Sequence, residues 1–251
     1  ISTHKSKFDS TMTKGFMVCN SAEFQRQVEL QFSDEAITKN TDYVKVVAYT
    51  NMAVSAWNKF IRESIIKDSE KSVITKNDLI TSYITLVNEF KETIIRNSED
   101  YIVRDIANYT HPKYDIKGFM VKFQAVHGGQ VTSPLFVLDH RDAYSIKRYC
   151  KICNELIEQA KNANKQVRAA KWKKYFEFRE SCLILINIAK ADGTVLHYRN
   201  LDYGFSVTAH KSQGSTYNVS MVDINDIVYD KNGHPYNNAK DINRRLYVAV
   251  S

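Results

Sequence analysis

One stretch of the sequence, FSVTAHKSQGSTY at residues 205–217, gathers side chains that are suited to holding an anion. It brings hydroxyl, imidazole, amine and amide groups together, and no carboxylate or cysteine interrupts them. The apolar start predicts a strand that ends at Thr208, where the backbone turns and its free N–H groups can bind phosphate oxygens. His210 and Lys211 would add charge-assisted hydrogen bonds, and Gly214 lets a ligand or a backbone come close. The alternative is an exposed polar turn that binds nothing.

The sequence contains none of the familiar patterns that cleave bonds unaided. It has eight glycines, and none of them fits GxxxxGK[ST], the phosphate-cradling loop of many nucleotide hydrolases. The metalloprotease pattern HExxH and the nucleophile elbow GxSxG do not occur either. These observations argue against a self-contained hydrolase.

A second polar strand end is predicted at Thr50 and Asn51. The valine-rich stretch YVKVVAYTN, residues 43–51, predicts a buried strand. Apolar residues then recur at helical spacing as far as residue 66, and threonine or asparagine is a good N-cap for such a helix. This strand, tight turn and helix form half of an α/β module. A helix N-terminus with these side chains favours phosphate, although one of them can also serve only as a cap.

The middle of the chain changes its pattern twice. Residues 70–140 form short segments rich in β-branched and aromatic residues, which predicts a small antiparallel barrel. Residues 141–182 carry apolar residues at spacings of three and four with a break at NANK, which predicts a helical hairpin. From residue 205 the α/β pattern returns, with the strands FSVTAH and YNVSMVDI, a short helix AKDINRR and a last strand LYVAVS.

Composition and charge limit the classes of protein to consider. With 43% hydrophobic and 25% charged residues and no run of about 18 apolar residues, we expect a globular protein without a membrane partner. Four cysteines fit a reducing cytosol, and we interpret the lone CxxC at Cys150 and Cys153 as buried helix residues rather than a zinc site. Residues 141–180 hold 11 Lys and Arg against 5 Asp and Glu, so this segment contributes +6 of the net charge of +7. Such a surplus of positive charge is typical of proteins that bind a polyanion.

Three segments in this order resemble helicase motifs. VVAYTNMAVSAWN, TAHKSQGST and LYVAVS are similar to motif IV, motif V and the start of motif VI in the C-terminal motor domain of superfamily 1 DNA helicases. The resemblance is to the RecD-like and Dda-like 5′-to-3′ branch, with a UvrD-like C-terminal domain. In the Dda-like arrangement an SH3-like module with a helical extension interrupts this domain. The string HKSQGST is the most specific part of the match.

The resemblance implies a fold and its division. We expect an α/β, RecA-like motor domain with a parallel sheet, interrupted by an SH3-like small β-barrel and a helical hairpin. The implied parts are a first RecA-like part with motif IV at 1–66, the barrel at 67–140, the basic hairpin at 141–182, and a second RecA-like part with motifs V and VI at 183–251.

The resemblance also implies ligands for the matching positions. The positions expected beside single-stranded DNA are Thr50, Asn51, Asn58, Thr208, His210 and Lys211. The positions expected beside ATP are Gln213, Gly214, Ser215 and Thr216. A single turn that touches both ligands could couple them, because any change on hydrolysis would move the DNA contacts.

The basic hairpin adds further candidates for DNA binding. The stretch KWKKYFEFR interleaves Lys171, Lys173 and Lys174 with aromatic residues. Basic residues can follow a phosphate backbone while aromatic rings stack on bases. The aromatic residues can equally be packed against a neighbouring element, because they recur at helical spacing.

No catalytic residue is expected within this chain. Ser55 stands near the place where other branches carry an arginine that reaches ATP, and the motif VI arginine is expected directly after Ser251. That arginine stabilises charge on the transferring phosphate, and Arg244 and Arg245 are weak substitutes for it. Because the chain begins at Ile1 and stops within LYVAVS, we expect a fragment of a longer protein. An N-terminal motor domain would supply the P-loop and most of the Mg²⁺ site.

We therefore hypothesise that the chain is the second motor domain of an ATP-dependent 5′-to-3′ DNA helicase. We expect this fragment to be inactive without the rest of the protein. The hypothesis implies ATP and Mg²⁺ as cofactors, with single-stranded DNA and the N-terminal motor domain of the same protein as partners. It further implies a monomer in the cytoplasm of a bacterial or phage-infected cell, acting in DNA replication or recombination. Two alternatives remain open: a non-catalytic module that binds single-stranded nucleic acid, and a RecD-like subunit of an exonuclease complex.

Overall fold

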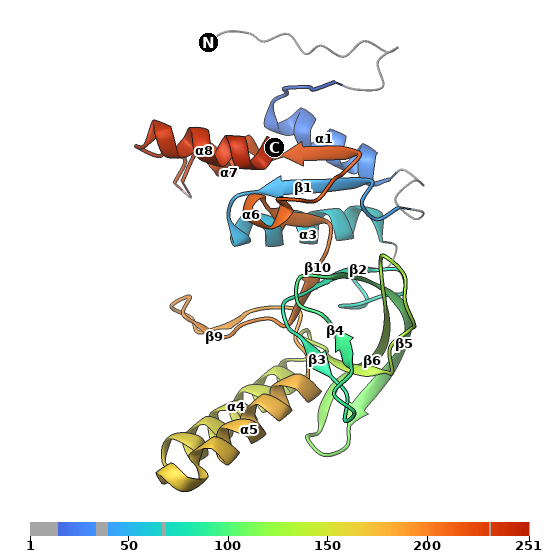
Figure 1. Cartoon of the computed structure of the whole chain (residues 1–251), viewed down its shortest axis with the longest axis vertical. Helices are drawn as coiled ribbons and strands as arrows, with labels where there is room; N and C mark the ends of the chain where they lie inside the picture. The colour runs from blue at the N-terminus through green and yellow to red at the C-terminus, as the bar shows by residue number, and fades with distance from the viewer. Residues whose placement is uncertain (1–14, 34–39, 67–68, 231, 251) are drawn as a thin grey trace.

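The protein is a mixed α/β structure with a parallel and an antiparallel sheet. The computed structural model describes residues 15–33, 40–66, 69–230 and 232–250, and every structural statement below concerns these ranges. Along the long axis of the molecule, the parallel sheet lies near one end, the antiparallel sheet follows, and a helical hairpin forms the other end (Figure 1). Within the described ranges, none of the helices is both long and apolar enough to cross a membrane.

The parallel sheet has three strands, with the valine-rich strand at its centre. In sheet order they are β11 (Ser206–Thr208), β1 (Val44–Ala48) and β12 (Val219–Val222). Ala48 is in register with Thr208, and Val47 is in register with Val222. The strands predicted around residues 43–51, 205–210 and 217–224 are therefore confirmed. Their carboxyl ends lie at the same edge of the sheet.

Helices cover both faces of this sheet. The helices concerned are α1 (Ser21–Phe32), α3 (Asn51–Ile65), α6 (Ala209–Ser212), α7 (Ile224–Val228) and α8 (Ala239–Val250). On one face, Val28 of α1 and Ile61 of α3 pack in the same apolar cluster as Val46. On the other face, Val47 packs with apolar residues of α6, α7 and α8. The sheet is therefore the buried central layer of an α/β unit.

The predicted last strand LYVAVS is wrong, because α8 continues through it to Val250. Ile242, Leu246 and Ala249 follow one another at spacings of four and three, so they line one face of a helix. Leu246 and Ala249 pack in the apolar cluster of Val47. A short apolar run does not distinguish a strand from the end of a helix by its periodicity alone.

The antiparallel sheet has five strands, of which four come from residues 79–138 and one comes from residues 201–203. In sheet order they are β10 (Leu201–Tyr203), β2 (Leu79–Ser82), β5 (Asp100–His111), β6 (Ile116–Ala125) and β7 (Leu135–Leu138). Their core contains Ile80, Val103, Val121 and Phe123. Two small hairpins accompany the sheet: β3 (Leu86–Val87) with β4 (Thr93–Ile95), and β8 (Ile188–Ala189) with β9 (Val195–His197).

The strands predicted for residues 70–140 are present, but the predicted closed barrel is not found among the described residues. Strands β10 and β7 are the two edges of the sheet, and no strand pairing joins them. After the hairpin, the chain pairs with the β7 edge at one isolated bridge, between Leu183 and Val137 of β7. A barrel needs a continuous ladder between its first and last strands, and one bridge does not supply it.

The predicted helical hairpin is confirmed as α4 (Ala143–Lys161) and α5 (Lys165–Ser181). Asn164, within the NANK break, caps α5 by accepting a hydrogen bond from the N–H of Val167. Tyr149, Phe178 and Cys182 pack in one buried cluster with Ile116 of β6, so the base of the hairpin rests on the antiparallel sheet. Cys153 of the CxxC pair is buried and Cys150 is half-buried, as a helix packing role requires.

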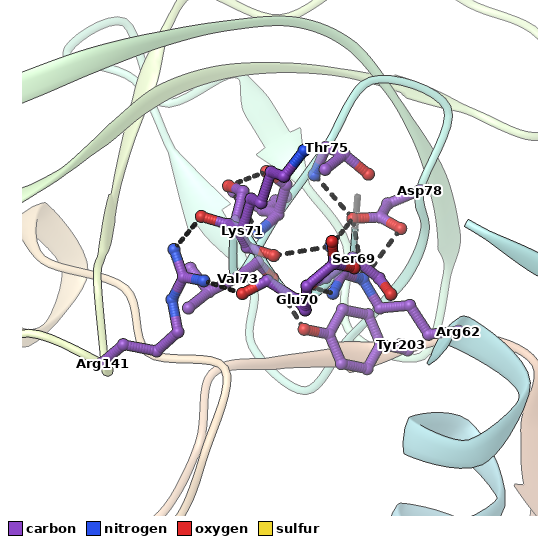
Figure 2. Close-up of polar contacts among 11 residues, drawn as sticks. Arg62, Ser69, Glu70, Lys71, Val73, Thr75, Asp78, Arg141 and Tyr203 are labelled. Atoms are coloured by element: carbon purple, nitrogen blue, oxygen red, sulfur yellow. Dashed lines mark hydrogen bonds and ion pairs between the residues drawn. The ribbon is translucent and has the colours of Figure 1, made fainter. Parts of the chain in front are cut away.

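A buried arginine holds the segment that leads from α3 to the antiparallel sheet (Figure 2). Arg62 Nη2 lies 3.1 Å from Asp78 Oδ2, and both side chains are almost fully buried. Arg62 also donates to the carbonyl oxygens of Ser69 and Ser72. From another side, Arg141 donates to the carbonyl oxygens of Glu70 and Lys71. These contacts fix the path between the two sheets.

Candidate functional site

The end of strand β1 is organised by a carboxylate from another part of the chain. Asp226 of α7 accepts hydrogen bonds of 2.7 Å from the N–H groups of Tyr49 and Thr50. It also accepts the hydroxyl of Thr50 at 2.8 Å, while that hydroxyl oxygen accepts from the N–H of Ala53. Thr50 is therefore the N-cap of α3, and its donors are already engaged by a carboxylate. Asn51, the first residue of the helix, is exposed beside it.

Asn58 lies inside the protein rather than on its surface. Its Oδ1 accepts the N–H of Ser206 at 2.7 Å, and its Nδ2 donates to Asp202 at 3.2 Å. Only 1% of Asn58 is exposed. The side chain thus holds the start of β11 and the middle of β10 against α3. In this structure it supports the candidate site and does not face a ligand.

The polar turn begins beside the end of β1, as the parallel pairing of β1 with β11 requires. Thr208 caps the short helix α6 by accepting the N–H of Lys211 at 3.3 Å. His210 is exposed, and its ring centroid lies 6.0 Å from that of Tyr49. The structure therefore brings the predicted residues around Thr50 and those around His210 together at one sheet edge.

Lys211 points toward the antiparallel sheet. Its Nζ lies 4.9 Å from the centroid of the Tyr83 ring, and the guanidinium of Arg199 lies 5.2 Å from the same centroid. Burial lowers the pKa of Lys211 below its ordinary value, and the charge of Asp100 opposes this shift. Lys211 is thus a half-buried cation between the two sheets, which its position in a polar turn did not indicate.

The remainder of the turn borders a cleft of about 580 Å³ between the α/β unit and the antiparallel sheet. Gln213 to Thr216 are all exposed. Gly214 has a φ of 82°, in the left-handed region that glycine adopts without strain. Gly214, Ser215 and Thr216 line the cleft, and the opposite wall is the loop at 96–100.

A separate hollow of about 770 Å³ lies next to Thr50. Its lining comprises Thr50, Met52, Asn225, Asp226, Tyr229, Asp230, Gly233 and Tyr236. It shares no lining residue with the cleft beside Gly214. Of the residues predicted for DNA, Thr50 lines this hollow, whereas Lys211 lines the cleft together with Gly214, Ser215 and Thr216, which were predicted for ATP.

The lysines of the hairpin are not brought to this edge. Lys173 and Lys174 of α5 are exposed and Lys171 is half-buried, and α5 lies at the opposite end of the molecule from the parallel sheet (Figure 1). Lys173 Nζ lies 3.8 Å from Glu177. Among the aromatic neighbours, Phe178 is buried in the hairpin core, whereas Phe176 is 55% exposed. Packing therefore accounts for Phe178, and the lysines remain available to a ligand at a distance from the turn.

Two arginines outside the predicted set occupy positions close to the site. Arg245 places its guanidinium 4.1 Å from the ring centroid of Tyr49 and 4.3 Å from that of Tyr236, and it donates to Asp241. Arg199 donates to the hydroxyl of Ser55 at 2.5 Å. Ser55 stands near the place where other branches of the helicase superfamily carry an arginine that reaches ATP. Arg245 is therefore held by aromatic rings, and Arg199 reaches α3 from the segment before β10.

Sequence reasoning missed four residues that shape this region, namely Arg199, Asp202, Tyr83 and Asp226. Arg199 Nη2 lies 2.9 Å from Asp202, which is buried, and burial raises the pKa of Asp202 to about 6 against the opposing effect of Arg199. Tyr83 and Asp226 likewise make their contacts with residues distant in the sequence. The one available signal was a carboxylate within the strand-like LDY segment, because an aspartate in a buried strand needs a partner.

Comparison with known proteins identifies no relative: no protein-family model matches the chain, and no curated protein matches it.

Proposed function

We propose that this chain is the second motor domain of an ATP-dependent 5′-to-3′ DNA helicase, with a RecA-like fold interrupted by an antiparallel β module and a basic helical hairpin. The observation that carries the proposal is the register of β1 with β11, which brings the ends of both strands to one edge. Ligands of open α/β sheets bind at the carboxyl ends of the strands. The HKSQGST turn leaves this same edge and is exposed where it borders the cleft.

Within the proposal, the DNA backbone contacts are carried by the exposed donors at this edge. Asn51 and His210 are exposed, whereas the donors of Thr50 are taken by Asp226. Thr50 and Asn58 then act as positioning residues, and Thr208 orients the turn as its cap. Residues 213–216 take the nucleotide side. Mg²⁺ and the P-loop belong to the partner motor domain, and the arginine expected after Ser251 completes the ATP site.

The arrangement of the elements supports the division that the proposal requires. All of the antiparallel sheet and both hairpin helices are formed by the chain between α3 and β11. The parallel sheet is covered on one face by α1 and α3, which precede the antiparallel sheet in the sequence, and on the other face by α6, α7 and α8, which follow it. Closure of two motor domains around ATP would move the HKSQGST turn and so the DNA contacts at the same edge.

A binding experiment tests the proposal on the chain itself. Fluorescence anisotropy with a labelled dT oligonucleotide measures the affinity of wild type, His210→Ala and His234→Ala. His234 is an exposed histidine on the loop between α7 and α8 and serves as the matched control. We expect His210→Ala to weaken binding by about 3- to 10-fold, as the loss of one phosphate contact does, and His234→Ala to have no effect.

The outcomes separate the hypotheses. Equal affinities for wild type and His210→Ala would contradict the assignment of this sheet edge to DNA. In the full-length protein, DNA-stimulated ATP hydrolysis supports a helicase motor, whereas binding of DNA without hydrolysis supports the non-catalytic module. Degradation of DNA ends in a complex with a nuclease would identify the RecD-like alternative.

A further inference from the structure

We infer that the helical hairpin carries an aromatic face that stacks on the bases of single-stranded DNA, at the opposite end of the molecule from the parallel sheet (Figure 1). The aromatic face consists of Trp172 and Phe176 of α5 and of Tyr198, which directly follows strand β9. The inference rests on the proposed function for the identity of the ligand. It adds base contacts at a place separate from the sheet edge.

The rings of α5 form one continuous surface. The ring centroids of Trp172 and Phe176 lie 6.2 Å apart, with an angle of 33° between the ring planes. Tyr175 contacts both rings edge-on, with centroid distances of 5.7 and 5.3 Å. Tyr175 packs against the buried cluster of the hairpin, whereas Trp172 is half-buried and Phe176 is 55% exposed. Packing therefore fixes the inner ring and leaves part of the outer two open to a ligand.

A second element brings another open ring to this face. Arg179 Nη2 donates to the backbone carbonyl of Tyr198 at 2.6 Å, and Nη1 donates to the hydroxyl of Tyr175 at 3.4 Å. Arg179 thus holds the chain after β9 beside the C-terminal part of α5, while the Tyr198 side chain is 70% exposed. A single exposed ring needs no explanation, but exposed rings gathered from two elements are typical of a binding surface.

The charge of the hairpin limits the kind of ligand. Helices α4 and α5 together carry ten Lys and Arg against four Glu, a net charge of +6, and residues 165–176 carry five Lys and Arg without any Asp or Glu. Lys151 pairs with Glu155 and Lys173 with Glu177, but all four side chains are more than half exposed, so water screens these pairs. Even with each Glu counted against one cation, six positive charges remain for a polyanion.

Single-stranded DNA is the polyanion that matches both the rings and the charge. Its phosphates are attracted by the basic residues, and its unpaired bases present flat faces to aromatic side chains. A duplex keeps these base faces inside its own stack, so a duplex would use the charge alone. An acidic protein surface is the alternative ligand, and the affinities below distinguish it from DNA.

Fluorescence anisotropy of the full chain tests the inference with a labelled dT oligonucleotide of about 12 nucleotides and a duplex of the same length. The matched control for Phe176→Ala and Tyr198→Ala is Phe90→Ala, because Phe90 is 76% exposed on the turn between β3 and β4. We expect Phe176→Ala and Tyr198→Ala each to weaken dT binding by at least about 5-fold, as the loss of one stacked base does, and to leave duplex binding unchanged. Phe90→Ala should change neither affinity.

Tryptophan fluorescence gives a second readout of stacking. The chain has two tryptophans, and the other one, Trp57 of α3, donates its indole N–H to Asp223 at 2.8 Å. We expect the dT oligonucleotide to quench the emission of the wild-type chain and expect this quenching to be lost in Trp172→Phe. Quenching that persists in Trp172→Phe would place the base contact near α3 and contradict the inference.

The outcomes separate this inference from the proposed function. Wild-type dT affinity in both Phe176→Ala and Tyr198→Ala, together with weakened binding in His210→Ala, would overturn the aromatic face as a DNA site and leave the proposed function intact. Equal losses for dT and duplex would also overturn it, since only unpaired bases can stack. Weakened dT binding in the two ring variants with wild-type binding in His210→Ala would support the aromatic face and contradict the sheet edge. Failure of the wild-type chain to bind dT would overturn both.

Discussion

The buried pair of Arg62 and Asp78 should be one of the strongest single determinants of the stability of this protein. Arg62 Nε lies 3.1 and 3.2 Å from the two oxygens of Asp78, and Nη2 lies 3.1 Å from one of them. The side chains are 5% and 0% exposed. The Asp78→Ala substitution leaves a buried guanidinium with only the carbonyl oxygens of Ser69 and Ser72 as acceptors. Breaking such a pair from one side costs about 3–5 kcal/mol.

The same helix offers a matched control. Lys59 Nζ lies 3.9 Å from Glu63, and these side chains are 74% and 57% exposed. Because water screens this pair, Lys59→Ala should change the free energy of unfolding by less than about 1 kcal/mol. The comparison therefore isolates burial, since both pairs begin on α3.

Urea unfolding followed by circular dichroism measures these free energies. The double variant Arg62→Met/Asp78→Ala removes both charges, so it should be more stable than the sum of the single losses predicts, by about 1–3 kcal/mol. Native-state hydrogen exchange should show faster exchange at residues 69–75 in Asp78→Ala, because Arg62 no longer holds this segment in place. A loss in Asp78→Ala as small as that in Lys59→Ala would refute the reasoning.

Three further predictions concern other parts of the molecule. The pKa of Asp202 is raised from 3.8 to about 6, so the folded state binds more protons than the unfolded state between these values. The protonated carboxyl therefore stabilises the folded state fully below about pH 4, and this contribution is lost by about pH 6. The free energy of unfolding should fall by about 3 kcal/mol over this range. Chemical denaturation should show a smaller fall in Asp202→Asn. In Gly118→Ala the added Cβ would lie 2.2 Å from the carbonyl oxygen of Val137, so thermal unfolding should show a loss of at least about 1–3 kcal/mol. The purified 251-residue chain should show no DNA-stimulated ATPase activity, and measurable turnover in a phosphate-release assay would contradict the proposed domain assignment.

Local sequence patterns predicted the elements whose apolar residues have one clear period. The valine-rich strand β1 with helix α3, and the hairpin of α4 and α5, were recognisable because burial on one side imposes a regular spacing. The same reasoning failed at residues 246–250, where a few apolar residues fit both a strand and the last turn of a helix. It also could not identify β10 as the edge of the antiparallel sheet, because a three-residue strand carries almost no periodic signal.

The candidate site shows the same limit. Thr50, Thr208 and His210 could be placed at one edge from the sequence, because parallel strands align their carboxyl ends. The burial of Asn58 could not be predicted, since it follows from hydrogen bonds to Asp202 and Ser206, which are 144 and 148 residues away. Nothing local distinguishes an asparagine that faces a ligand from one that ties two elements together.

The sequence by itself therefore determined which residues are suited to phosphate and the order of the elements that carry them. Only the tertiary structure decided which of these residues are free to act. Asp226 approaches Thr50 from 176 residues away, and Tyr83 and Arg199 approach the HKSQGST turn from the antiparallel sheet. The physical reason is that helix and strand periods record which side of an element is buried, whereas the identity of the neighbour depends on how distant elements pack.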